Sequence, residues 1–228
     1  MYRKLLQKIS RLAQELYYRT LIRSFSVYQP VYLHGKLIKV GDRGCLDRWQ
    51  IIRREIEARD VKSVVDLGCA EGFYVIQAAK ECGCLSFGIE ANTRRLSVAQ
   101  IQLALEKTMP AGFMLGSISE EFLDRLPQFD LVIFMSVLHH MMYSHGADYC
   151  RRILQKLRPK IGKAMIFEMG QSDETFHKWA KQLPDMGAEP HEWIKQFLQS
   201  CGFSRITKIG ESTSYRSNRK RAIFLVEP

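Results

Sequence analysis

An acidic residue and two glycines are the first group in this sequence that could do chemistry. Asp66 ends an apolar, β-branched run, Gly68 and Gly72 lie in the turn after it, and a helix is predicted from about Phe73. Glycines let a backbone pass close to a ligand, and helix N-terminal N–H groups bind polar or anionic atoms. The spacing Gly-x-x-x-Gly, with Ala70 between, departs from the G-x-G-x-x-G of dinucleotide-binding loops and disfavours NAD.

A second acid, Glu90, ends the next predicted strand, 90 − 66 = 24 residues after Asp66. A carboxylate at such a strand tip can accept both hydroxyls of a ribose. A solvated strand-end acid is the alternative. Taken with the Asp66 turn, Glu90 predicts a ligand that contains a ribose.

Three histidines follow the predicted strand 129–135: His139, His140 and His145. We expect His140 to act as a general base for a hydroxyl acceptor or as a hydrogen-bond donor, and His139 and His145 to bind the acceptor. A packed structural ring is the alternative for one of the adjacent pair. Zinc is disfavoured because no carboxylate or cysteine lies at supporting spacing, so no metal is predicted. Glu168, which ends the fifth strand, is expected to accept a hydrogen bond from a sugar hydroxyl or to orient His140; an unremarkable strand-end acid is the alternative.

The composition is that of a folded protein with a hydrophobic core, which can hold such residues in fixed positions. The chain has 228 residues, of which 46% are hydrophobic and 25% charged, which excludes disorder and low complexity. The formal net charge of 34 − 24 = +10 favours an anionic partner.

Six scattered cysteines lack metal-binding or CxxC spacing and are expected to be reduced thiols. Without a membrane-spanning run or a signal peptide, we expect a cytoplasmic protein, with contact to the inner membrane face as an option.

Short apolar runs alternate with helical periods from residue 63 onward, which predicts strand–helix–strand units and a parallel sheet buried on both faces. Two final strands without a helix between them predict a hairpin, so the last strand must be antiparallel. The predicted strands are 63–67, 85–90, 113–115, 129–135, 164–169, 204–209 and 222–226. The fold class is therefore α/β.

The first 25 residues predict a basic amphipathic helix, with an apolar stripe at Leu5, Ile9, Leu12 and Leu16. We expect the stripe to pack on its own domain or on a second subunit; an anionic membrane surface is the alternative. Residues 28–44 are rich in turn formers. The predicted division is residues 1–44, a helix and lid segment, and 45–228, the main domain.

Several motifs together resemble those of class I S-adenosylmethionine-dependent methyltransferases. They are the segment DLGCAEG from Asp66, Glu90, the turn LGSI at 115–118, the strand FDLVIFMSVLHH and the closing hairpin. The resemblance covers about residues 45–228 and implies a Rossmann-like, doubly wound, seven-stranded sheet with one reversed strand. It implies S-adenosylmethionine as cofactor. The implied cofactor-binding residues are Asp66, Gly68, Cys69 and Gly72 near the methionine and ribose, Glu90 on the ribose hydroxyls, Ser117 and Ile118 beside the adenine, and Ser136.

The segment before the main domain resembles a cofactor lid and contributes Tyr28, Arg43 and Arg48. A lid that excludes water positions the methyl group against its acceptor, and an arginine can clamp the cofactor carboxylate. Ordinary surface cations are the alternative reading of Arg43 and Arg48.

Within that class, DLGCAEGF, SVLHHMMYSHG and the preceding YQ…RGCLDRW segment are similar to the methyltransferase part of the kinase-methyltransferases that cap bacterial O-antigen polymannose. The SVL-x-H strand end is also similar to tRNA wobble-uridine carboxymethyltransferases, although the arginine pair expected after the histidine is absent. The predicted function is methyl transfer to an anionic or glycan-linked acceptor, a phosphate or a hydroxyl. The alternatives are an RNA-modifying methyltransferase and a non-catalytic cofactor-binding protein.

The hairpin turn is predicted to supply acceptor contacts. The strand 204–209 should run parallel to the core strands, so the following loop lies beside the ligand-binding edge. Its cations suit phosphate oxygens, and a solvated turn is the alternative. The loop residues are Tyr215, Arg216, Arg219, Lys220 and Arg221.

Overall fold

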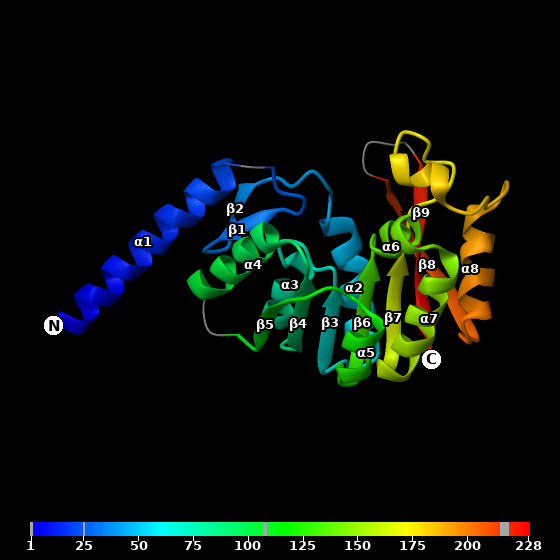
Figure 1. Ribbon diagram of the computed structural model, residues 1–228. Coiled ribbons are helices and arrows are strands. Elements are labelled where there is room, and N and C mark those ends of the chain that lie inside the picture. Colours follow the sequence, from blue (N-terminus) through cyan, green and yellow to red (C-terminus); the bar gives the residue numbers. More distant parts are fainter. Residues whose placement is uncertain (1, 25, 107–108, 215–218) are drawn as a thin grey trace.

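The computed structural model describes residues 2–24, 26–106, 109–214 and 219–228. A seven-stranded sheet in the order β5-β4-β3-β6-β7-β9-β8 forms the centre of the molecule (Figure 1). Its strands are β3 (Ser63–Leu67), β4 (Leu85–Glu90), β5 (Ala111–Leu115), β6 (Phe129–Met135), β7 (Ile161–Glu168), β8 (Arg205–Thr213) and β9 (Lys220–Glu227). The core pairs are parallel, and β9 runs antiparallel to both β7 and β8. The predicted fold class and the reversed last strand are confirmed.

Apolar residues on both faces of the strands explain the two helical layers. In β6, Leu131 and Ile133 pack into one core cluster, whereas Val132 and Phe134 pack into the other. The first cluster includes side chains of α2 (Leu46–Ala58) and α3 (Phe73–Glu81). The second includes residues from α5 (Glu120–Arg125), α6 (Leu138–His145), α7 (Ala147–Leu157) and α8 (Pro190–Ser200). A strand buried on both faces needs this continuous apolar run.

The N-terminal part adds a third, smaller core. Here α1 (Tyr2–Ser24) and a hairpin of β1 (Val31–Leu33) and β2 (Lys36–Lys39) pack against α4 (Thr93–Leu105). The segment predicted as turn-rich therefore contains a hairpin. Its turn residues, His34 and Gly35, have φ of 51° and 74°, which matches the positive φ values of a two-residue hairpin turn.

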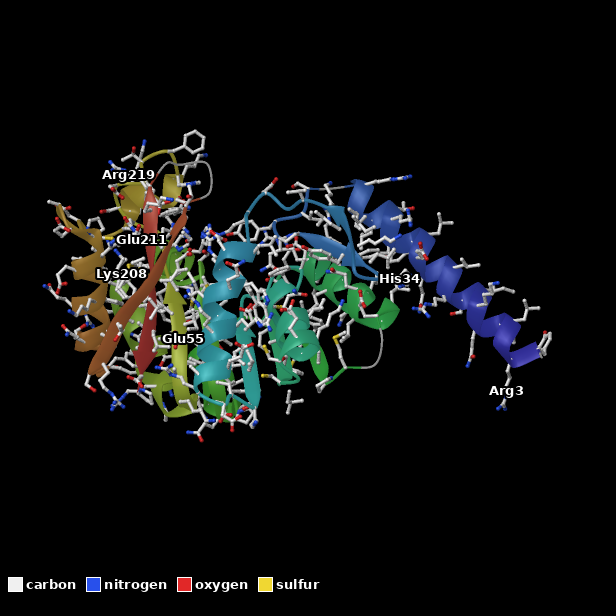
Figure 2. All side chains as sticks on the ribbon, turned by 180° about the vertical axis from the view of Figure 1, so that it is seen from behind. Arg3, His34, Glu55, Lys208, Glu211 and Arg219 are labelled. Atoms are coloured by element: carbon white, nitrogen blue, oxygen red, sulfur yellow. The ribbon has the colours of Figure 1, made fainter. Side chains whose placement is uncertain are left out.

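The first half of α1 extends away from the rest of the chain (Figure 1), and Arg3 lies near its free end (Figure 2). None of the helices in the described parts of the chain is long and apolar enough to span a bilayer. All six cysteines are free thiols.

The carboxyl ends of the parallel strands share one edge of the sheet, at the top in Figure 1. Above this edge lies the segment that follows β7 and contains the short helix η2 (Lys178–Gln182). Another short helix, η1 (Arg158–Lys160), precedes β7. Strand β8 continues to Thr213, four residues beyond the predicted end, so the end of β8 and the start of β9 lie at the same edge, as expected. Residues 215–218 of that turn lie outside the described residues.

Candidate active site

A cavity of about 400 Å³ opens at the carboxyl ends of β3, β4, β5 and β6. The topology brings together eight of the residues predicted from the sequence. These lining residues are Tyr28, Gly68, Glu90, Ser117, Ile118, Ser136, His140 and His145. The cavity lies where open parallel sheets bind ligands and has the size of a small-molecule site.

The turn after β3 is shaped by backbone conformations that favour glycine. Gly68 has φ of +85°, and a Cβ there would lie 2.5 Å from a methyl carbon of Val137. The Gly68 and Cys69 N–H groups both donate to the carbonyl of Ile89, at 2.8 and 3.0 Å. These contacts fix the turn against the end of β4 and leave Gly68 at the cavity wall.

Glu90 connects the end of β4 to this turn. Its Oε2 accepts a hydrogen bond from the Ala70 N–H (2.8 Å) and its Oε1 accepts one from the Asn92 N–H (2.7 Å). Ala70 has a left-handed φ of 49°, so the Glu90 contact supports an uncommon backbone conformation. Each carboxylate oxygen has more than one acceptor site, so Glu90 can hold the turn and still accept hydroxyl groups from a ligand.

Asp66 lies behind the cavity and is incompletely satisfied. Only 3% of the residue is exposed, and its Oδ2 has no hydrogen-bond partner among the described residues. Burial, with a smaller contribution from the negative charge of Glu90, raises the pKa of Asp66 to about 8. Asp66 lines a second, much smaller cavity of about 20 Å³ that shares Tyr28, Gly68 and Ser136 with the main one. An orphaned buried carboxyl oxygen fits a site that receives a polar ligand group.

Two predicted cofactor contacts shape the turn instead of lining the main cavity. The sulfur of Cys69 is fully buried against β4, since a Cβ on Gly88 would lie 2.6 Å from it. Gly72 is the N-cap of α3 and packs against Phe113. The Phe73 N–H at the start of α3 is also occupied, because it donates to the Gln29 side chain at 2.9 Å. The prediction that the N–H groups at the start of α3 bind a ligand is therefore wrong for Phe73.

The structure contradicts the role expected for Glu168. Its carboxylate is completely buried and accepts hydrogen bonds from Arg43, from Arg48 Nε (2.9 Å) and from Ser136 Oγ (2.7 Å). Burial alone would raise its pKa, but three nearby arginines outweigh this and hold the pKa of Glu168 below its usual value. A carboxylate this fully paired can neither meet a sugar hydroxyl nor act as a base, so Glu168 is a structural anchor beneath Ser136.

The same contacts change the expected roles of Arg48 and Arg43. Arg48 also donates to the carbonyls of Gly44 (2.6 Å) and Thr213 (3.2 Å). Its guanidinium is occupied by the protein and does not clamp a cofactor carboxylate. Arg43 is 5% exposed and lines the small cavity beside Asp66. Both are buried, so neither is an ordinary surface cation.

Arg221, predicted to reach a phosphate, is instead buried behind the site. It forms a two-pronged ion pair with Glu174 (2.7 and 2.8 Å) and lies 3.4 Å from Glu168. The buried ionic cluster thus comprises Arg43, Arg48, Arg221, Glu168 and Glu174. With three cations and two anions its formal charge is 3 − 2 = +1.

The two adjacent histidines have different surroundings. His139 is 2% exposed, its Nδ1 accepts the Gly170 N–H (3.0 Å), and its ring lies 4.3 Å from that of Trp179. His139 is therefore a packed structural ring, and the prediction that it binds the acceptor is wrong. His140 lines the main cavity. Desolvation, then the positive charges of Arg221 and Arg95, lower the pKa of His140 to about 4, so the imidazole is neutral at pH 7.

The predicted acceptor loop is described in part. Arg219 is 61% exposed and forms an ion pair with Asp173 (3.1 Å), in the segment after β7. Figure 2 shows it at the strand-end edge of the molecule. Tyr215 and Arg216 lie outside the described residues. His145 lines the main cavity and packs against Tyr149, with ring centres 4.7 Å apart.

Sequence reasoning missed Arg95, which lines the cavity and lies 5.1 Å from the centre of the Tyr28 ring. It lies in the first turn of α4, after the N-cap Asn92, next to Arg94. Cations are unfavourable at a helix N-terminus, so this arginine pair was a signal of function. Glu71 was also missed; it accepts the backbone N–H groups of Tyr28 (3.0 Å) and Gln29 (2.9 Å) and thereby anchors the lid segment.

The sheet order, the reversed strand and the cavity define the class I methyltransferase fold. Residues 64–160 match the family model described as "Methyltransferase domain".

Two curated proteins from Escherichia coli, both called O-antigen chain terminator bifunctional methyltransferase/kinase WbdD, are 31% and 30% identical to this chain over 208 residues. The match covers 88% of this chain and 27% of each relative, so the chain spans about a quarter of their length. A crystal structure of WbdD superimposes with a TM-score of 0.78 at 28% identity, covering 92% of this chain and 46% of that one. The N-terminal domain of EvdMO1, crystallised with SAH and D-fucose, shows the same fold at 17% identity, with a TM-score of 0.64 and coverage of 93% and 95%.

Proposed function

We propose that this chain is an S-adenosylmethionine-dependent methyltransferase that holds its cofactor in the main cavity. The observation that carries the proposal is the convergence of Gly68, Glu90, Ser117 and Ser136 on one cavity at the strand ends of a methyltransferase domain. The orphaned Oδ2 of Asp66 supports it, because a buried carboxyl oxygen beside the cavity requires a polar partner.

The residues present fit the parts of that cofactor. Glu90 would accept the ribose hydroxyls, Ser117 and Ile118 would flank the adenine, and Asp66, Gly68 and Ser136 would lie towards the methionine part. S-adenosylmethionine supplies a methyl group on a positively charged sulfur. The protein's contribution is then to exclude water and to hold the acceptor in line with that group.

Residues 1–44 are proposed to form a separate N-terminal segment ahead of the domain of residues 45–228, and its part after α1, from Tyr28, is proposed to cover the cofactor. Tyr28 supports this, because it lines the main cavity while its N–H donates to Glu71, which lies between β3 and α3 of that domain.

The acceptor is proposed to be an anionic group, a phosphate, on a glycan. The name of the relatives, O-antigen chain terminator and methyltransferase/kinase, supports a glycan and a phosphate together. The net charge of +10 and the position of Arg95 at the cavity wall support an anion. A phosphate oxygen is already a nucleophile at pH 7, so the neutral ring of His140 would serve as a hydrogen-bond partner and not as an essential base.

A transfer assay with isotopically labelled methyl donor tests the proposal. The acceptors are a mannose oligosaccharide with a terminal phosphate and the same oligosaccharide without it. We expect label only in the phosphorylated glycan. Equal labelling of both would contradict the anionic acceptor, and failure to bind S-adenosylmethionine at all would contradict the enzyme assignment.

A further inference from the structure

The exposed half of α1 carries a row of large apolar side chains. The row, called here the outer stripe, consists of Tyr2, Leu5, Ile9, Leu12 and Leu16, which are 54–75% exposed. Their spacing of three and four residues places them on one side of the helix. Exposed apolar side chains on soluble proteins are usually scattered singly, whereas these five form a continuous row. Such a contiguous apolar patch marks an interaction site.

The protein's own domain does not cover the outer stripe. The side of α1 that meets the body carries Tyr18, which is fully buried and donates to the Tyr32 carbonyl (3.1 Å), and Arg11, which donates to the Leu105 carbonyl (2.9 Å). At 100° per residue, Arg11 and Tyr18 point within about 20° of each other, whereas the outer stripe is centred about 150° away. The stripe therefore faces away from the body, and α1 extends past it (Figures 1 and 2).

The charge of α1 distinguishes between possible partners. The helix contains six cations and one acid, Glu15, so its formal charge is 6 − 1 = +5. The cations are Arg3, Lys4, Lys8, Arg11, Arg19 and Arg23. Two copies of such a helix would repel each other, whereas an anionic surface would attract it.

We propose that the outer stripe docks on an anionic lipid surface, with α1 lying in the plane of the interface. An apolar face flanked by lysine and arginine on a helix is the pattern of interfacial helices, which insert their apolar side chains below charged head groups. A helix of 23 residues is about 35 Å long and would lie along the surface. This inference is independent of the proposed acceptor and of the cofactor site.

Vesicle flotation of the full chain tests this proposal. The probes are vesicles of phosphatidylcholine alone and vesicles that also contain phosphatidylglycerol. We expect binding to the second kind, with loss of binding as the salt concentration rises. A variant with Leu5→Gln, Ile9→Gln, Leu12→Gln and Leu16→Gln keeps helix-forming residues and should partition at least about tenfold less.

A matched control replaces apolar residues that are equally exposed but lie elsewhere. Leu46→Gln with Leu85→Gln, at 56% and 58% exposure, should bind vesicles like the parent. Light scattering of the parent without lipid should report a monomer. Absence of binding to the anionic vesicles, equal binding by the stripe variant, or a stable dimer that the stripe variant dissociates would each overturn the proposal.

Discussion

Arg48 donates from Nε to Oε2 of Glu168 at 2.9 Å, and this contact joins α2 to the end of β7 beneath the cavity. Arg43 binds the other carboxylate oxygen and Arg221 approaches it from β9. One buried carboxylate thus connects the lid segment, two strands and a helix to Ser136, which lines the cavity. The cluster is the support on which the site is built.

Removing that carboxylate's charge should therefore destabilise the fold. Glu168→Gln leaves three buried guanidinium groups undercompensated, and the expected loss is about 3–5 kcal/mol in the free energy of unfolding. Urea denaturation measures it. Glu211→Gln, which removes an exposed partner of Lys208, is the control and should change stability by less than about 1 kcal/mol. Equal effects of the two substitutions would contradict the structural role of Glu168.

Asp66 predicts a pH dependence of stability. Its pKa is raised from 3.8 to about 8, so between these values the folded protein holds a proton that the unfolded chain has released. This contribution to stability is complete below pH 3.8 and is lost as pH rises towards 8. The Asp66→Asn variant has no titrating group at this position. The free energy of unfolding of the parent relative to that of the variant should therefore fall by up to about 1.4 kcal/mol for each unit that the pH rises. A difference that is constant over this range would show that Asp66 does not titrate as stated.

The sheet could be predicted from the sequence because its central strands are apolar on both faces. The strands Ser63–Leu67, Leu85–Glu90 and Phe129–Met135 have the predicted bounds. Strand β8 was predicted too short, since its last four residues, Gly210 to Thr213, alternate little and are held by pairing with β9. The cavity residues Gly68, Glu90 and Ser117 could be predicted because strand ends in a parallel sheet meet at one edge.

The buried ionic cluster could not be predicted, because its pairs join residues far apart in the chain. Arg43 and Glu168 are 125 residues apart, and Arg48 and Glu168 are 120 apart. No local pattern marks such partners. A charged residue in the sequence reads as exposed unless its partner is known.

The His140 ring should remain neutral at pH values where a free histidine gains a proton. Desolvation and nearby arginines lower its pKa from 6.5 to about 4. NMR titration of the imidazole, assigned with His140→Gln, should therefore show no protonation of this ring near pH 6.5. With a phosphate acceptor, His140→Gln should lower kcat less than the factor of about 100 or more that loss of a general base causes. A His140 ring that titrates near pH 6.5, or a loss of kcat by a factor of about 100 or more in His140→Gln, would contradict this prediction and support His140 as the general base.

Arg95 and Arg94 form a matched pair for testing the anionic acceptor. Both lie in the first turn of α4, and of the two Arg95 lines the cavity. Arg95→Gln should raise KM for a phosphorylated acceptor about tenfold, the size of one charge-assisted hydrogen bond, with a smaller change in kcat. Arg94→Gln should leave both constants near those of the parent. The same KM for both variants would remove Arg95 from the acceptor site.

The central claim is that the cavity at the strand ends binds S-adenosylmethionine through Glu90. Calorimetric titration of S-adenosylmethionine into the parent, into Glu90→Gln and into the exposed control Glu121→Gln tests it most directly. Loss of a carboxylate that accepts two hydroxyls should weaken binding about tenfold to a hundredfold, about 1.5–3 kcal/mol, while the control binds like the parent. Binding by folded Glu90→Gln that equals that of the parent, or no binding by the parent, would contradict the account.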